Sequence, residues 1–147
     1  MMMLFLRNYM SQWLIFWPIY LPMSGNRELG QKGERLAREY VKRTLGWHIL
    51  SHNWRCSFGE LDIIAQKSNK IIAIEVKTRS ASLTMGYSNE AATTQKIKRM
   101  FKLLQYYLVH EQPMFNSIEF PEIQLDWIDI VMYREEVISF SHFTYEN

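Results

Sequence analysis

Four charged side chains interrupt the two most strand-like stretches of the chain. Glu60 and Asp62 lie in "ELDIIAQ", and Glu75 and Lys77 lie in "IIAIEVK". Ionised groups are rarely buried unless they are paired or bound to a metal. Carboxylate oxygens are the ligands that Mg²⁺ and Mn²⁺ prefer, and a nearby lysine can hold a phosphate or help to activate a water. Together these residue types suit phosphodiester hydrolysis.

The spacing predicts that the four groups meet on one face of a β-hairpin. A symmetric turn at residues 67–70, "KSNK", places Asp62 opposite Glu75 and Glu60 opposite Lys77. Residues two apart on a strand share a face, and opposed residues have Cβ atoms roughly 4.5–5.5 Å apart. Two facing carboxylates repel each other unless a cation compensates them, so we expect a divalent metal ion between them.

The alternative is a salt-bridged face of the sheet that binds nothing, as exposed antiparallel sheets often carry. Two observations favour a functional site. Residues 71–77 are apolar on both faces apart from their two charges, which is typical of a central strand. Glu34 shares the predicted inward stripe of a helix with Ala37 and Val41, whereas Glu39 falls on the opposite, solvated face.

A later helix repeats this pattern with lysines. Its predicted inward stripe consists of Ile97, Phe101, Leu104 and Leu108. Lys96 shares a neighbouring stripe with Met100, Leu103 and Tyr107, so it could point toward the acidic patch. Lys98 and Lys102 form a flanking basic row, for which ordinary solvation is the competing interpretation.

Periodicity and turn residues predict the elements that position these groups, in the order α-β-β-β-α-β-β. The predicted helices are 27–45, which Gly46 ends, and 89–110; the predicted strands are 47–55, 60–66, 71–79, 124–133 and 136–143. Residues 80–88 are predicted to be a loop, 113–121 an irregular connection, and the last two strands a hairpin.

Composition predicts one globular domain. The chain has 147 residues, of which 48% are apolar and 22% charged, and its net charge of +2 permits a nucleic-acid partner without requiring one. The single cysteine, Cys56, excludes an internal disulfide and cysteine-rich zinc sites, and nothing nearby marks it as a nucleophile. The four histidines show no metal-binding spacing, and we expect His110 and His142 at the surface. Trp47, Trp54 and Trp127 are interpreted as packing residues rather than as base-stacking platforms.

Residues 1–23 differ in composition from residues 24–147, which we expect to form the domain. "WLIFWPIYLP" is apolar, but it is short for a membrane span and contains two prolines. Three interpretations are open: an upstream extension with Met23 as the true initiator, a weak interfacial anchor, and a cleaved signal peptide. The first fits the targeting criteria best.

The ordered motifs resemble a known enzyme superfamily. Asp62 followed by Glu75-Val76-Lys77 matches the D…(D/E)xK signature of the PD-(D/E)XK nucleases, which include restriction enzymes and Holliday-junction resolvases. More narrowly, the chain resembles the bacterial YraN family of uncharacterised proteins over roughly residues 26–133. The matching stretches are "GERLA", "NWR", "GELDIIA", "IEVKTR" and the helix that begins near Lys96.

The resemblance implies an α/β fold with a restriction-endonuclease-like α-β-β-β-α-β core, in which helices flank a mixed central sheet. It implies Asp62 and Glu75 as metal ligands, Lys77 as the residue that orients the attacking water, and Glu34 as a further catalytic acid. It also implies Gly59 and Glu60 as supporting residues. We expect Lys96 as a further supporting residue, and Arg55, Arg79, Lys98 and Lys102 as nucleic-acid contacts. Asp129 aligns with the family, but Trp127 stands where the family tends to have an arginine.

The expected function is therefore a Mg²⁺- or Mn²⁺-dependent endonuclease, similar to Holliday-junction resolvases. The alternative is a nucleic-acid-binding module that does not cut, and a structural or membrane-associated protein is a third hypothesis, which rests on the apolar leader. We expect a cytoplasmic protein that binds DNA rather than RNA, with no small-molecule cofactor and no membrane partner, and a homodimer is the candidate assembly.

Overall fold

The computed structural model describes residues 25–81, 93–111 and 121–145. Its elements, in chain order, are α1 (Gly25–Glu39), the π-helix η1 (Tyr40–Thr44), β1 (His48–Cys56), β2 (Gly59–Lys67), β3 (Lys70–Ser80), α2 (Thr94–Glu111), β4 (Glu122–Tyr133) and β5 (Glu136–Tyr145). This is the predicted order. The predicted leader 1–23, the loop residues 82–88, the helix residues 89–92 and the connection 113–120 lie outside the described residues. No helix in the described part of the chain is long and apolar enough to cross a membrane.

The five strands form one mixed sheet in the order β1-β2-β3-β4-β5. All neighbours are antiparallel except β3 and β4, which run parallel. The predicted α/β class with helices around a mixed sheet is thus confirmed, and β3 is the central strand, as its two apolar faces indicated.

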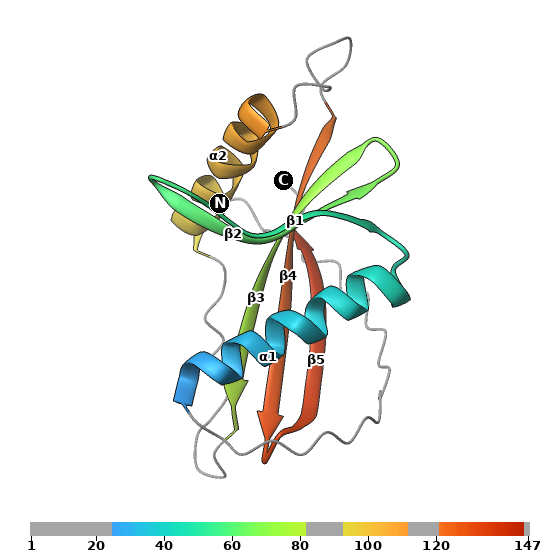
Figure 1. The fold of residues 1–147 in the computed structure, drawn as a ribbon, viewed down its shortest axis with the longest axis vertical. Helices are drawn as coiled ribbons and strands as arrows, with labels where there is room; N and C mark the ends of the chain where they lie inside the picture. Colours follow the sequence, from blue (N-terminus) through green and yellow to red (C-terminus); the bar gives the residue numbers. More distant parts are fainter. Residues whose placement is uncertain (1–24, 82–92, 112–120, 146–147) are drawn as a thin grey trace, which may run out of the picture.

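Side-chain alternation on β3 separates two cores. Ile72 and Ile74 pack with α1, whereas Ile71 and Ala73 pack with α2, so the two helices cover opposite faces of the sheet. Figure 1 shows α1, in blue to cyan, crossing over β3, β4 and β5. Glu75 and Lys77 follow directly after this buried segment of β3, so they begin where the hydrophobic core ends.

The β2–β3 hairpin has the predicted register. Gln66 pairs with Ile71 and Ile63 pairs with Ile74, which places the turn at residues 68 and 69. The paired residues of this hairpin end at Ile63, and Figure 1 shows the β1–β2 ribbon bending away from the other strands.

Helix α1 approaches β3 closely at one glycine. A Cβ built on Gly33 would lie 1.7 Å from Oγ1 and 2.7 Å from Cβ of Thr78, so no larger residue fits there without moving the helix. The next residue is Glu34, so this contact also sets how near that carboxylate lies to the sheet. At the other end of the helical segment, Gly46 adopts a φ of 66° and ends it as predicted.

Helix α2 is rotated relative to the prediction. Its buried residues are Met100, Leu103, Leu104, Tyr107 and Leu108. Phe101, which was predicted to face inward, is 41% exposed. The two candidate stripes are neighbours on the helix, and the stripe that contains Lys96 lies nearer the centre of the buried face. Side-chain periodicity alone did not distinguish them.

The predicted surface position of His142 is wrong. Its Nε2 lies 2.7 Å from Oδ2 of Asp126, which is fully buried, and its Nδ1 lies 3.4 Å from the hydroxyl of Tyr40. The Nε2 amide of Gln124 donates to the other carboxylate oxygen of Asp126 at 2.9 Å. Neighbouring strands and the helical segment before β1 thus enclose this carboxylate and satisfy it, which no local sequence pattern indicates.

Candidate metal and nucleic-acid site

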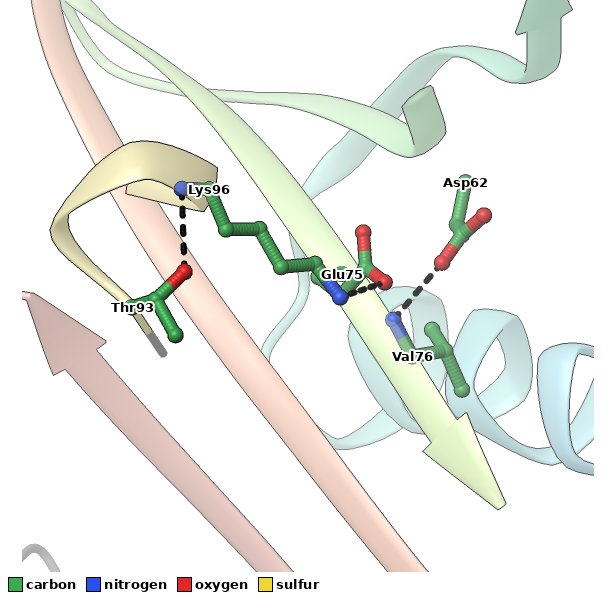
Figure 2. A network of polar contacts seen from close by, with 5 residues as sticks. All are labelled: Asp62, Glu75, Val76, Thr93 and Lys96. Carbon is green, nitrogen blue, oxygen red and sulfur yellow. Dashed lines mark hydrogen bonds and ion pairs between the residues drawn. The ribbon is translucent and has the colours of Figure 1, made fainter. Parts of the chain in front are cut away.

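At the point where β2 stops pairing with β3, the side chain of Asp62 accepts a hydrogen bond from a backbone amide of β3. The N–H of Val76 donates to Oδ2 of Asp62 at 2.8 Å (Figure 2). The last paired residues before this point are Ile63 and Ile74, so the carboxylate satisfies a β3 amide beyond the end of the ladder. This bond fixes the Asp62 side chain beside the strand that carries Glu75.

The partner strand is also irregular here. Asn53 lies between His52 and Trp54, which pair with Ile63 and Leu61, so it sits across from Asp62. Its φ of 50° is left-handed, a conformation that asparagine tolerates better than most residues. Such local departures from regular geometry often occur at functional sites.

The environment of Asp62 disfavours its charged form. Burial, followed by the charge of Glu75, raises the pKa of Asp62 from 3.8 to about 7. The more weakly acting charges of Glu34 and Glu60 also raise this pKa, while the hydrogen bond from Val76 lowers it. Asp62 therefore lies among acidic groups whose combined field would attract a cation.

Glu75 already holds a cation, the ammonium group of Lys96. The Nζ of Lys96 lies 2.5 Å from Oε1 of Glu75 (Figure 2). The hydroxyl of Thr93 accepts a hydrogen bond from the Lys96 amide at 3.3 Å and so caps the start of α2. The ring of Trp127, which pairs in register with Glu75, lies 5.5 Å from the same Nζ. Trp127, standing in place of the expected arginine, thus helps to hold Lys96 over the site.

A cavity of about 320 Å³ opens beside Asp62. Glu34 from α1 and Glu60 from β2 line it together with Asp62. The other lining residues are Arg27, Gly30, Gln31, Asn53 and Arg55. The structure therefore brings the predicted helix acid and Asp62 to one solvent-accessible space, while Glu75 approaches Asp62 from β3.

The predicted pairing of Glu60 with Lys77 is wrong. Glu60 lies opposite Arg55 of β1, and Oε2 of Glu60 is 3.0 Å from Nε of Arg55. The reason is that β2 has two neighbours, and at this level it has already left β3 and remains paired with β1. Lys77 is half-buried two residues after Glu75 and pairs in register with Asp129 of β4.

The residues predicted to contact nucleic acid occupy different surroundings. Arg79 forms an ion pair with Asp129, at 3.1 Å between Nη2 and Oδ1. Lys98 and Lys102 are exposed on α2.

Gly59, at the start of β2, approaches Leu103 of α2 so closely that an added Cβ would lie 2.9 Å from Cδ1.

Sequence reasoning missed two polar residues of the cavity, Arg27 and Gln31. They precede Glu34 by seven and three positions on α1. Residues at these spacings lie on one face of a helix, so the position of Glu34 could have identified both. The role of Asn53 had no such signal, because its left-handed backbone depends on the irregular pairing of β1.

A family model matches most of the chain. The match covers residues 33–139, and its description is "Uncharacterised protein family UPF0102". The chain belongs to the UPF0102 family. This is the YraN family that the sequence motifs predicted, so that resemblance is confirmed. The matched range contains every residue predicted for the site, whereas Arg27 of the cavity precedes it.

Curated UPF0102 relatives are similar over most of their own length. A UPF0102 protein of Desulfitobacterium hafniense is 37% identical over 115 residues, which is 78% of this chain and 90% of the relative. One from Syntrophomonas wolfei is 40% identical over 107 residues, 73% of this chain and 87% of the relative. One from Caldicellulosiruptor saccharolyticus is 43% identical over 86 residues, 58% of this chain and 71% of the relative.

The oxygen donors of this UPF0102 chain suit a hard divalent cation. Within residues 25–81, 93–111 and 121–145, no three acidic, histidine or cysteine side chains are close enough to form a complete metal site. Mg²⁺, however, usually keeps several waters and is held by one or two carboxylates. The neighbouring carboxylates of Asp62 and Glu75 match that requirement, and a bound cation would offset the burial and the neighbouring charges that raise the pKa of Asp62.

Proposed function

We propose that this UPF0102 protein is a Mg²⁺- or Mn²⁺-dependent nucleic-acid phosphodiesterase that cuts DNA, as junction-resolving endonucleases do. The observation that carries the proposal is the half-buried Asp62 carboxylate, held against β3 beside Glu75 and facing a cavity that Glu34 also lines. A structural salt bridge would pair Asp62 with a cation, whereas its raised pKa arises from burial and from three other carboxylates.

Each residue has a role in this proposal. Asp62 and Glu75 would hold the metal ion, which when bound activates a water and polarises the phosphate. Lys77, two residues after Glu75 on the same face of β3, would donate hydrogen bonds to the attacking water or to the phosphate oxygens. Glu34 would accept a proton or hold an outer water from the opposite wall of the cavity. Lys96 holds one carboxylate oxygen of Glu75, so a metal ion that bound this carboxylate would compete with the ion pair.

One observation favours a second function, a module that binds nucleic acid without cutting it. The ammonium group of Lys96 neutralises Glu75, and the ring of Trp127 supports it in that position. A lysine that stays there permanently would take the place of the metal ion. Binding would then depend on phosphate contacts and on ionic strength, with no requirement for a divalent cation.

The decisive experiment measures cleavage and metal binding on the same set of variants. Branched, single-stranded and duplex DNA, and RNA, are incubated with Mg²⁺ or Mn²⁺ and with the wild type, Asp62→Asn, Glu75→Gln or Lys77→Met. We expect each substitution to reduce cleavage by at least 100-fold, since each removes a group at the reacting centre. Glu122→Gln is the matched control, because Glu122 is an exposed acid that pairs with Lys70 at the far end of β3.

Cleavage that survives in both Asp62→Asn and Lys77→Met would exclude this site as the catalytic centre. Salt-sensitive binding of DNA with no cleavage in either metal would instead support the non-cutting module. Isothermal calorimetry with Mn²⁺ also separates the nuclease from the non-cutting module. Only the nuclease requires that the protein bind Mn²⁺ and that Asp62→Asn abolish this metal binding.

A further inference from the structure

Three aromatic rings form an exposed row outside both cores. Phe58, in the turn between β1 and β2, lies edge-to-face against Tyr106 of α2, with 4.8 Å between ring centroids. Tyr106 in turn lies 4.1 Å from the ring of His110, one helical turn further along α2. Phe58 is 48% exposed and Tyr106 is 37% exposed. We call Phe58, Tyr106 and His110 the aromatic row.

The aromatic row is held in place from below and from the side. Trp54 packs beneath it, with its ring centroid 6.2 Å from that of Tyr106 and 5.4 Å from that of Tyr107. Nη2 of Arg99 donates to the carbonyl of Phe58 at 3.3 Å, which ties the β1–β2 turn to α2. The absence of a side chain at Gly59 lets the turn approach the helix closely. The rings are therefore preorganised, and a ligand would not have to order them.

Positive charge surrounds the row. Arg99 and Lys102 precede Tyr106 by seven and four positions, so all three lie on one face of α2, and both cations are exposed. Arg99 also lines an open groove of about 350 Å³ with Arg55, Cys56, Gly59 and Glu60. Aromatic rings beside cations are the arrangement that binds single-stranded nucleic acid, where bases stack on rings and cations contact phosphates.

The groove adjoins the carboxylate cavity. Arg55 and Glu60, which form an ion pair with each other, line both spaces, so the two lie next to each other along the β1–β2 ribbon. Gly59 and Asp62 are three residues apart on β2, which corresponds to about 10 Å. A strand whose phosphate lay near Asp62 could therefore place a neighbouring nucleotide in the groove and its base on the row.

We propose that the aromatic row and its adjoining groove bind an unpaired segment of a nucleic-acid strand next to the scissile phosphate. The substrate class is then a nucleic acid with a single-stranded portion, such as a flap, a gap or an open junction, rather than a continuous duplex. Cleavage of this strand rests on the proposed function, whereas its binding to the aromatic row does not. Uncharged apolar partners fit less well, because the row is flanked by cations.

Binding measured without cleavage tests this proposal. Fluorescence anisotropy with a labelled oligothymidine and with a blunt duplex is recorded in EDTA, so that no strand is cut. We expect Phe58→Ala and Tyr106→Ala each to weaken binding of the single strand about tenfold, because each removes a stacking surface, and to leave duplex binding unchanged. Tyr106→Phe, which keeps the ring, should bind as the wild type does.

Phe101→Ala is the matched control. Phe101 is an aromatic residue of α2 with 41% exposure, but it lies about 140° around the helix from Tyr106, so its removal should leave single-strand binding unchanged. Circular dichroism melting of all variants identifies any loss of folding. Single-strand binding that is unaffected by Phe58→Ala and by Tyr106→Ala would overturn the proposal. So would a change in oligomeric state on sedimentation without a change in binding, which would identify the row as a contact between two copies of the chain.

The same variants distinguish failure of this proposal from failure of the proposed function. Glu122→Gln, which changes the exposed acid at the far end of β3, should bind the single strand as the wild type does. If the wild type binds through the aromatic row but cuts nothing with any metal ion, the binding proposal stands and the nuclease is excluded. If it cuts duplex DNA with no dependence on Phe58 or Tyr106, the nuclease stands and the proposed substrate class is wrong.

Discussion

Asp62 is the residue on which the chemistry depends. It is placed by a single backbone hydrogen bond, from Val76, and the acids around it oppose its ionisation. A protein gains no stability from such an arrangement, because a carboxylate that must be ionised in partial burial costs free energy. The cost is expected at a site that uses the charge to bind a cation.

This cost predicts how stability changes with pH. The pKa of Asp62 is about 7 in the folded protein and ordinarily 3.8, so the folded state retains the proton over this interval. The contribution of Asp62 to stability should therefore be greatest below about pH 4 and fall as the pH rises toward 7. Asp62→Asn should remove the penalty and raise the free energy of unfolding by about 1–3 kcal/mol at pH 8, with no gain at pH 4. Urea unfolding in metal-free buffer from pH 4 to pH 8 measures this, and an equal gain at both pH values would contradict it.

Lys96 predicts a competition between an internal cation and a metal ion. If its ammonium group must leave Glu75 for a metal ion to bind, Lys96→Met should raise the affinity for Mn²⁺ about tenfold, which is the effect of 1.4 kcal/mol. Isothermal calorimetry provides the measurement. Lys98→Met, which removes an exposed lysine two positions away, should leave the affinity unchanged. Weaker Mn²⁺ binding by Lys96→Met would show that the lysine supports the metal site rather than competes with it.

Helix α1 reaches the site because Gly33 permits a close crossing over Thr78 of β3. The helices and strands themselves were predictable, since helical spacing and alternating apolar residues identified those of the described residues in their correct order. The rotation of the helices about their axes and the pairing of the strands were less predictable. Local pattern did not show that Glu60 would pair with β1 or that Phe101 would face solvent, because both depend on which neighbour packs against the element. Counting residues around one short turn predicted Asp62 opposite Glu75; the paired residues end one pair earlier, at Ile63 and Ile74, and Glu75 still lies near enough for its charge to raise the pKa of Asp62.

The close crossing predicts opposite effects for two glycines in α1. Gly33→Ala would force its methyl group into Thr78 and should destabilise the protein by about 1–3 kcal/mol, the usual cost of overpacking. Gly30 has nothing within 4 Å of a Cβ, so Gly30→Ala should stabilise the helix by about 0.5–1 kcal/mol. Thermal and urea unfolding of both variants test this. Equal effects of the two substitutions would rule out the crossing at Gly33.

The side chains of the proposed sites come from helices on both faces of the sheet. Helix α1 contributes Glu34 to the carboxylate cavity, whereas α2 contributes Lys96, the exposed cations and part of the aromatic row. The net charge of +2 is small, so electrostatic attraction to nucleic acid must come from local groups rather than from the overall field.

This distribution predicts a modest dependence of binding on salt. Three exposed cations of α2, Lys98, Arg99 and Lys102, would give a log–log slope of about −2 for a single strand, so affinity should fall about 20-fold between 50 and 200 mM salt. Lys102→Gln should reduce the slope by about 0.7. Lys42→Gln, which changes an exposed lysine on η1, should not. Anisotropy titrations at four salt concentrations provide the slopes, and a slope unchanged by Lys102→Gln would place the phosphate contacts elsewhere.

The contrast between the antiparallel β2–β3 hairpin and the parallel β3–β4 pair has a consequence for folding kinetics. The hairpin joins residues close in the chain, and such structures form in about 1–10 μs, whereas Lys70 and Glu122 pair across about 50 residues and must close a long loop first. We therefore expect Asp62 and Glu75 to meet early, before β4 joins the sheet, and their like charges to slow that step. We expect Mn²⁺ to accelerate refolding of the wild type but not of Asp62→Asn in stopped-flow experiments, so that a ligand of the finished site would also stabilise an early step of its assembly.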